Sequence, residues 1–136
     1  MRDIRIAAAQ FEAADGIKEY NLAQIKRLAK DAVALGAEVV SFHEMSITGY
    51  SFLQDATREK MLSIAEFVPA GPSCVALHEI AFELNVPILA GLLEVEKETG
   101  AIYNTYVCAH PTQGIVASHR KLHAFLNPHL SSGDKF

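Results

Sequence analysis

Features that mark several other classes of protein are missing from this sequence. No apolar run approaches the roughly eighteen residues of a membrane-spanning helix, and charges interrupt the N-terminus where a signal peptide has its apolar region. The net charge is -4 and there is no basic run, so the charge pattern of a nucleic-acid-binding protein is absent. We therefore expect a cytoplasmic protein that binds neither membranes nor nucleic acids.

Cysteine is also scarce. Cys74 and Cys108 are the only two, and their separation matches neither a metal-binding nor a redox motif. Both lie in apolar stretches, which is typical of reduced thiols packed in a core. No glycine-rich phosphate loop follows the first predicted strand, which argues against a nucleotide-binding protein.

The residues that are present suffice for one α/β domain. Half of the 136 residues are hydrophobic, enough for a core. Short apolar runs alternate with segments of helical spacing, and the first of these units should be a β-α-β unit with parallel strands and a right-handed crossover. We expect strands at residues 4–11, 39–42, 86–94, 101–109 and 114–120, and helices at 21–36, 57–67 and 73–84. Asn21 should cap the first helix, the first strand should become fully buried after its opening alternation, and the last two strands should form a hairpin.

Charged residues follow three of the predicted strands. Glu44 comes just after the run at 39–42 and precedes a turn, whereas Glu94 and Lys121 end or follow later strands. Open α/β sheets collect their chemistry at the carboxyl ends of strands, where a glutamate and a lysine could serve as general base and oxyanion stabiliser. By position alone, each could equally be a solvated surface charge.

Four motifs along the chain occur in an informative order. They are residues 6–11 (Ile-Ala-Ala-Ala-Gln-Phe), 42–44 (Phe-His-Glu) with 49–50 (Gly-Tyr), 91–94 (Gly-Leu-Leu-Glu) with 103–105 (Tyr-Asn-Thr), and 119–123 (His-Arg-Lys-Leu-His). Together they resemble the N-terminal half of the nitrilase, or carbon–nitrogen hydrolase, superfamily. The resemblance implies an α/β fold that is part of an α-β-β-α four-layer sandwich.

The resemblance also implies a Cys-Glu-Lys site that hydrolyses non-peptide carbon–nitrogen bonds in small amides, nitriles or carbamoyl compounds. In that scheme Glu44 is the general base and Lys121 stabilises the charge that develops on the substrate. Glu94, Tyr50 and His123 are candidates for supporting the site or lining its pocket. The resemblance implies that neither a metal nor an organic cofactor is required. Because members of the family commonly form oligomers, it also implies a homo-oligomer.

Two departures from the family pattern stand out. The family's cysteine nucleophile lies well beyond the lysine, so we expect residues 1–136 to be the incomplete N-terminal part of one domain and inactive alone. Neither Cys74 nor Cys108 has the residues that surround that nucleophile. Many members also carry an acidic residue shortly after the lysine, but positions 126–129 here hold Leu-Asn-Pro-His.

Other interpretations stay open at this stage. His119, His123 and His129, with His43 or Glu44, could form a metal site. The chain could instead be a non-catalytic binding or assembly half with the same fold. A separate chain could also supply the cysteine.

Overall fold

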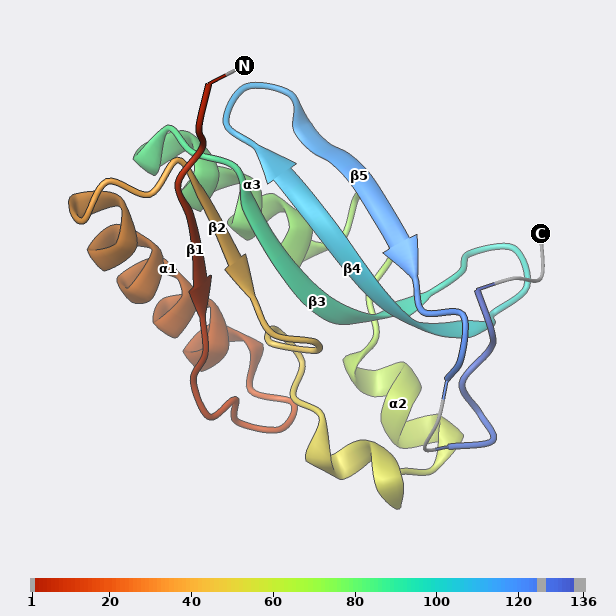
Figure 1. Ribbon diagram of the computed structural model, residues 1–136. Helices are drawn as coiled ribbons and strands as arrows, with labels where there is room; N and C mark the ends of the chain where they lie inside the picture. Colours follow the sequence, from red (N-terminus) through yellow and green to blue (C-terminus); the bar gives the residue numbers. More distant parts are fainter. Residues whose placement is uncertain (1, 125–126, 134–136) are drawn as a thin grey trace.

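The computed structural model describes residues 2–124 and 127–133 (Figure 1). In chain order the elements are β1 (Ile6–Ala9), α1 (Lys18–Ala34), β2 (Val39–Phe42), the 3-10 helix η1 (Ser51–Gln54), α2 (Arg58–Ile64), α3 (Pro72–Leu84), β3 (Ile88–Val95), β4 (Ile102–His110) and β5 (Gly114–Arg120). None of the helices in the described ranges combines the length and the apolar character that crossing a membrane requires.

Helix α1 forms where apolar residues repeat every three or four positions, and Ile25 and Ala29 on this face are fully buried. It ends before Gly36, whose φ of 91° only glycine adopts easily. The prediction that Asn21 caps the helix is wrong, because α1 begins at Lys18 and Asn21 is buried within it. The Asn21 side chain instead donates to the carbonyls of Ala14 and Ile47, at 2.8 and 2.9 Å.

The strands form one sheet in the order β1-β2-β3-β4-β5. β1, β2 and β3 are parallel, which confirms the predicted orientation of the first unit, and β3-β4-β5 are antiparallel, with β4 and β5 forming the predicted hairpin. β1 is shorter than predicted, and the expectation that it becomes fully buried after its opening alternation is wrong, since Ala8 is exposed and Ala7 and Ala9 are only partly buried. The reason is that β1 is an edge strand with a single neighbour, β2.

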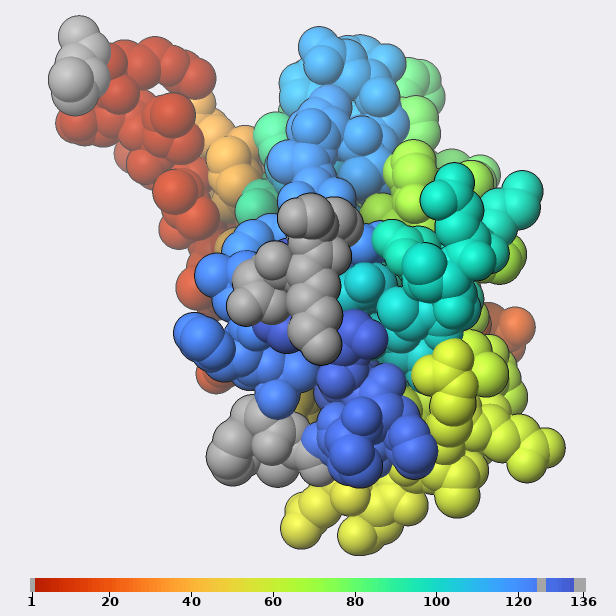
Figure 2. Space-filling view, turned by 90° about the vertical axis from the view of Figure 1, so that its right-hand side faces the viewer, coloured from red at the N-terminus to blue at the C-terminus, as the bar shows by residue number. Residues whose placement is uncertain are grey.

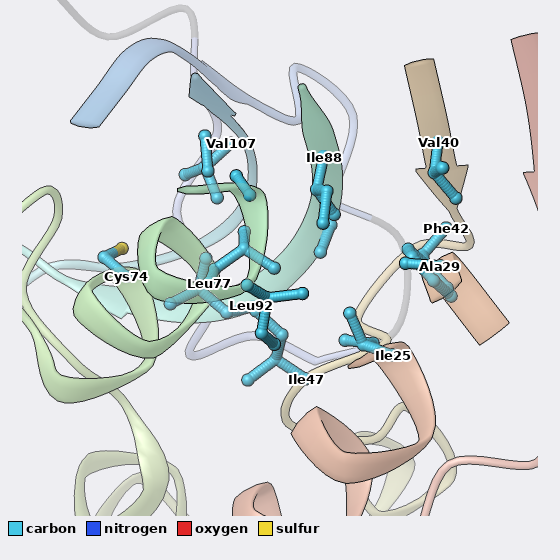
Figure 3. Close-up of a cluster of buried hydrophobic side chains, with 14 of the residues drawn as sticks. Ile25, Ala29, Val40, Phe42, Ile47, Cys74, Leu77, Ile88, Leu92 and Val107 are labelled. Atoms are coloured by element: carbon cyan, nitrogen blue, oxygen red, sulfur yellow. The ribbon is translucent and has the colours of Figure 1, made fainter. Parts of the chain in front are cut away.

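Helices α1 and α3 cover one face of the sheet, which we call the helix face (Figures 1 and 3). Apolar side chains from both helices meet alternate residues of the strands there, as Leu77, Ile88, Leu92 and Val107 do in Figure 3. The described residues thus supply one helical layer and one sheet of the α-β-β-α arrangement.

Among the residues that the structure describes, those that cover the opposite face, which we call the site face, gather at one end of it. A smaller apolar cluster there joins Met45, Leu53, Met61, Leu93 and Ile102. Segment 127–133 also packs at this end, where Leu130 touches the cluster and bridges to Ile102. Figure 2 shows this segment, in dark blue, against α2 and the β3–β4 connection. The site face therefore has an apolar base beside a more open area.

Candidate active site

The turn after β2 positions Glu44 by lying directly against β3. A Cβ on Gly91 would collide with the backbone nitrogen of Met45, so only glycine lets the turn come this close. The Ile47 amide donates to the Gly91 carbonyl at 2.9 Å, and the Leu93 amide donates to Thr48 Oγ1 at 3.1 Å. The turn is thus bonded along β3, and Glu44 projects from an anchored backbone.

Glu44 and Lys121 form an ion pair although 77 residues separate them. Lys121 Nζ donates to Glu44 Oε1 at 2.7 Å, and the side-chain amide of Asn104 donates to the same oxygen. The lysine and glutamate side chains are 36% and 41% exposed. The hydrogen bond to Glu44, reinforced by its negative charge, raises the pKa of Lys121 above its ordinary value. Lys121 is therefore an ammonium, not a base, near neutral pH.

Two hollows border Glu44. The first has a volume of about 310 Å³ and is lined by Phe42, Glu44, Asn104, Tyr106, His119 and Lys121. The second, of about 520 Å³, is lined by Gln10, Phe11, His43, Glu44 and Tyr50, so Tyr50 lies beside the glutamate as a pocket residue would. A larger hollow of about 580 Å³ beside β5 includes neither Glu44 nor Lys121, so its size does not make it the site.

His43 belongs to the wall of the second hollow. Its ring packs on Phe11 with centroids 5.1 Å apart, and its Nδ1 donates to the Glu44 carbonyl at 3.0 Å. Its Nε2 is buried and has no hydrogen-bond partner in the described part of the chain.

Glu94 lies on the helix face, away from Glu44 and Lys121. Its side chain is 6% exposed and accepts hydrogen bonds from Arg120 at 2.6 and 3.1 Å and from Thr105 at 2.5 Å. Arg120 also binds Glu96 at 2.9 Å and stacks over the ring of Tyr103 at 3.9 Å. Because successive side chains at a strand end point to opposite faces, the partner of Glu94 is Arg120, not the adjacent Lys121.

The model of the carbon–nitrogen hydrolase family matches residues 5–135. This chain belongs to that family. It is 31% identical over 122 residues to a nitrilase of Pyrococcus abyssi, covering 90% of this chain and 44% of the relative. It is 32% identical over 127 residues to omega-amidase NIT2 of Bos taurus, covering 92% and 42%. The chain therefore spans less than half the length of these curated relatives.

Solved structures of other proteins share the fold. Nit3 of Saccharomyces cerevisiae, a member of branch 10 of that superfamily, matches with a TM-score of 0.82 and 23% identity, over 97% of this chain and 49% of the other. An amidase from Nesterenkonia sp. matches with a TM-score of 0.75 and 21% identity, over the same shares. The expected nitrilase-like α/β fold is thus confirmed.

Other residues that the sequence analysis singled out lie apart from the Glu44–Lys121 pair. His123 is exposed and, among the described residues, makes no hydrogen bond to either. Asn127 donates to the carbonyls of Leu53 and Ala56, both at 2.9 Å, and so anchors its segment to η1; Leu126 lies outside the described residues.

The geometry of the described residues gives no support to the histidine metal site. Residues 2–124 and 127–133, which include all the histidines of that hypothesis, hold no group of 3 or more His, Cys, Asp or Glu arranged to bind a metal ion. His43, His119, His123 and His129 come from separate turns, a strand and a loop, and the fold does not gather them.

Both cysteines are free thiols placed for packing. Cys74 in α3 is 1% exposed, and burial, together with the charges of Glu66 and Glu94, raises its pKa to about 12. Cys108 in β4 is half-buried, and burial raises its pKa as well. Both are therefore protonated near neutral pH, whereas a nucleophilic cysteine needs its thiolate.

The residue that sequence reasoning missed is Asn104. It appears in the sequence only as the middle of a Tyr-Asn-Thr motif in a strand. Asn104 lies inside a predicted strand, and a buried side-chain amide needs a hydrogen-bond partner. The sequence therefore did indicate that Asn104 binds another polar group. That partner, Glu44, is 60 residues away and could not be read from local spacing.

Proposed function

We propose that the protein hydrolyses non-peptide carbon–nitrogen bonds of small amides, nitriles or carbamoyl compounds, with Glu44 as general base and Lys121 as oxyanion stabiliser. The observation that carries this proposal is the 2.7 Å ion pair between them beside an open hollow. The nucleophile of the proposal is a cysteine outside residues 1–136. Residues 1–136 would then be the N-terminal part of one catalytic domain and inactive alone.

The proposed reaction on an amide begins when Glu44 takes the proton of the thiol and the thiolate attacks the carbonyl carbon. The carbonyl oxygen becomes negatively charged, and the Lys121 ammonium stabilises it. Glu44 returns the proton to the nitrogen, the carbon–nitrogen bond breaks, and a thioester remains. Glu44 then takes a proton from water, hydroxide attacks the thioester carbon and displaces the thiolate, and Glu44 returns the proton to sulfur.

The dimensions of the site support small substrates. A hollow of about 310 Å³ lies at the lower end of the roughly 300–1,000 Å³ typical of small-molecule sites. The relatives described as a nitrilase and an omega-amidase are consistent with this class. The cytoplasmic location and the homo-oligomer stay predictions.

One observation favours a second candidate, a non-catalytic binding or assembly half. Neither Cys74 nor Cys108 contacts Glu44, so the described residues hold a base and a cation without a nucleophile. In this alternative the ion pair would be a remnant of an ancestral site.

The test is ammonia release from a panel of small amides and nitriles by the complete natural protein. We expect Glu44→Gln and Lys121→Met each to lower the rate by roughly 10²–10⁴-fold. Glu83→Gln is the matched control, because Glu83 forms an exposed 2.5 Å pair with Lys26 on the helices and should leave the rate unchanged. Full activity in Glu44→Gln would contradict the assigned base. No turnover of any substrate by the natural protein would favour the binding alternative.

A further inference from the structure

We infer that Asn104 is a positioning residue for Glu44: with Lys121 it occupies Oε1 and leaves Oε2 as the atom that accepts the proton. This inference rests on the proposed function and deepens it. Asn104 acts through the glutamate and takes part in no bond that forms or breaks.

Asn104 contacts both members of the ion pair. Its side-chain amide donates to Glu44 Oε1, and its backbone carbonyl accepts a hydrogen bond from the Lys121 amide at 2.8 Å. One residue of β4 thus fixes the backbone from which the lysine extends and the oxygen that the lysine binds. The separation of the two charges is therefore set by β4 and not by the ions alone.

The scaffold of Asn104 is more rigid than either charged side chain. Asn104 is 7% exposed and pairs with Leu93 of β3, and its neighbours Tyr103 and Thr105 are buried. Lys121 has a long flexible stem, and exposed pairs of this kind exchange partners readily. An amide held in the middle of a sheet can select one carboxylate oxygen where an exposed ammonium alone would not.

The selected oxygen determines which atom is left for chemistry. Within the described ranges, Glu44 Oε2 accepts no hydrogen bond, whereas Oε1 accepts two. Transfer of a proton from the thiol to Oε2 neutralises the carboxylate without displacing either donor from Oε1. The same transfer weakens the hold of Glu44 on Lys121, so the ammonium becomes available as negative charge develops on the substrate.

The competing explanation is structural. A buried amide requires a hydrogen-bond partner in any case, and Asn104 could simply stabilise the sheet. The two explanations differ in what a substitution changes. A structural role predicts a lower melting temperature with an unaltered catalytic step, whereas positioning predicts a loss in kcat.

The kinetic test compares Asn104→Leu and Asn104→Asp in the complete natural protein. Neither variant offers the amide donor, and we expect kcat to fall by roughly 10–100-fold with KM changed by less than about threefold. Thr105→Val is the matched control, because it removes a neighbouring donor that binds Glu94 on the helix face, and kcat should be unchanged. A rise in KM at constant kcat would overturn the inference and make Asn104 a substrate-binding residue. Unchanged kcat in both variants would also overturn it.

A second measurement does not depend on turnover or on the folding of Asn104 variants. NMR spectra of each variant are compared with those of the natural protein. The Glu44→Gln substitution should shift the signals of the Asn104 side-chain amide and the Lys121 ammonium, and Glu83→Gln should shift neither. Unshifted Asn104 signals in Glu44→Gln would overturn the inference whatever the activity. Shifted signals in a protein that turns over no substrate would support the positioning of Glu44 and reject the proposed hydrolysis.

Discussion

Arg120 and Lys121 are neighbours in the chain, yet each binds a glutamate on a different face of the sheet. On the helix face, Arg120 and Glu94 lie 2.6 Å apart with side chains 16% and 6% exposed. On the site face, Lys121 and Glu44 lie 2.7 Å apart with side chains 36% and 41% exposed. The distances are nearly equal, so exposure and additional partners distinguish the two pairs.

The two glutamates differ in how much of each carboxylate is already bound by other residues. Glu94 receives two hydrogen bonds from Arg120 and one from Thr105, and little of the group is left for a ligand. Glu44 has both donors on one oxygen and borders two hollows. Removing one member of the buried pair should therefore lower the stability of the fold more than removing one member of the exposed pair, which contributes little to folding and is accessible from the hollows.

The largest expected effect on stability tests this division directly. Glu94→Gln removes the more buried of the two carboxylates that pair with Arg120 and leaves Glu96 as its partner, and we expect the free energy of unfolding to fall by roughly 2–4 kcal/mol. Glu44→Gln should change it by less than about 1 kcal/mol, because that pair is exposed. Urea denaturation of both variants measures the two values. Equal losses of unfolding free energy in the two variants would contradict the view that the Glu94 pair stabilises the fold more than the Glu44 pair does.

A smaller effect is expected at the contact that anchors the Glu44 turn. Gly91→Ala places a methyl group against the backbone of Met45, and such overpacking typically costs about 1–3 kcal/mol. The displaced turn should also disturb the Glu44–Lys121 pair, seen as a shifted Lys121 ammonium signal in NMR spectra. Gly114→Ala is the control, since that glycine has a φ of 76° but no atom near its Cβ position. It should cost stability without moving the Lys121 signal.

The pH dependence of the exposed pair can be measured at Lys121. Its pKa is raised above the ordinary value of 10.5 by Glu44, so Glu44→Gln should bring it back toward that value. A cation whose pKa is higher in the folded state stabilises the fold fully below its ordinary pKa and loses this contribution as the pH rises through the folded value. The window therefore lies above pH 10.5. An NMR titration of the Lys121 amine gives the pKa in each protein, and identical values would show that the pair is not formed.

The smallest effect concerns the thiols on the two faces. Burial raises the pKa of Cys74 to about 12, and Cys108 is less buried. A thiol reagent at pH 8 should therefore label Cys108 before Cys74 in the native protein, as mass spectrometry of the labelled peptides can measure. The raised pKa of Cys74 contributes stability that is present below its ordinary value of 9.0 and is lost as the pH rises toward 12. Equal labelling rates would show that α3 opens readily.

Several local features could be predicted because local sequence encodes them. The β2 run at 39–42 and the β4–β5 hairpin agree with the structure, as does the apolar face of α1. Asn21 was misassigned because capping residues and buried anchors use the same side chain, and its distant partner Ile47 decided between them. The burial of β1 was overestimated because an apolar run does not reveal whether its strand lies at an edge.

By itself, the sequence determined that Glu44 and Lys121 stand at strand ends and that its motifs, in their order, resemble those of the nitrilase superfamily. Only the tertiary structure decided that Glu94 pairs with Arg120 and that Asn104 and Lys121 both donate to Glu44 Oε1. The physical reason is the alternation of side chains along a strand, in which a shift of one residue moves a side chain to the other face. Composition and spacing placed the charges along the chain, but strand register determined which of them meet.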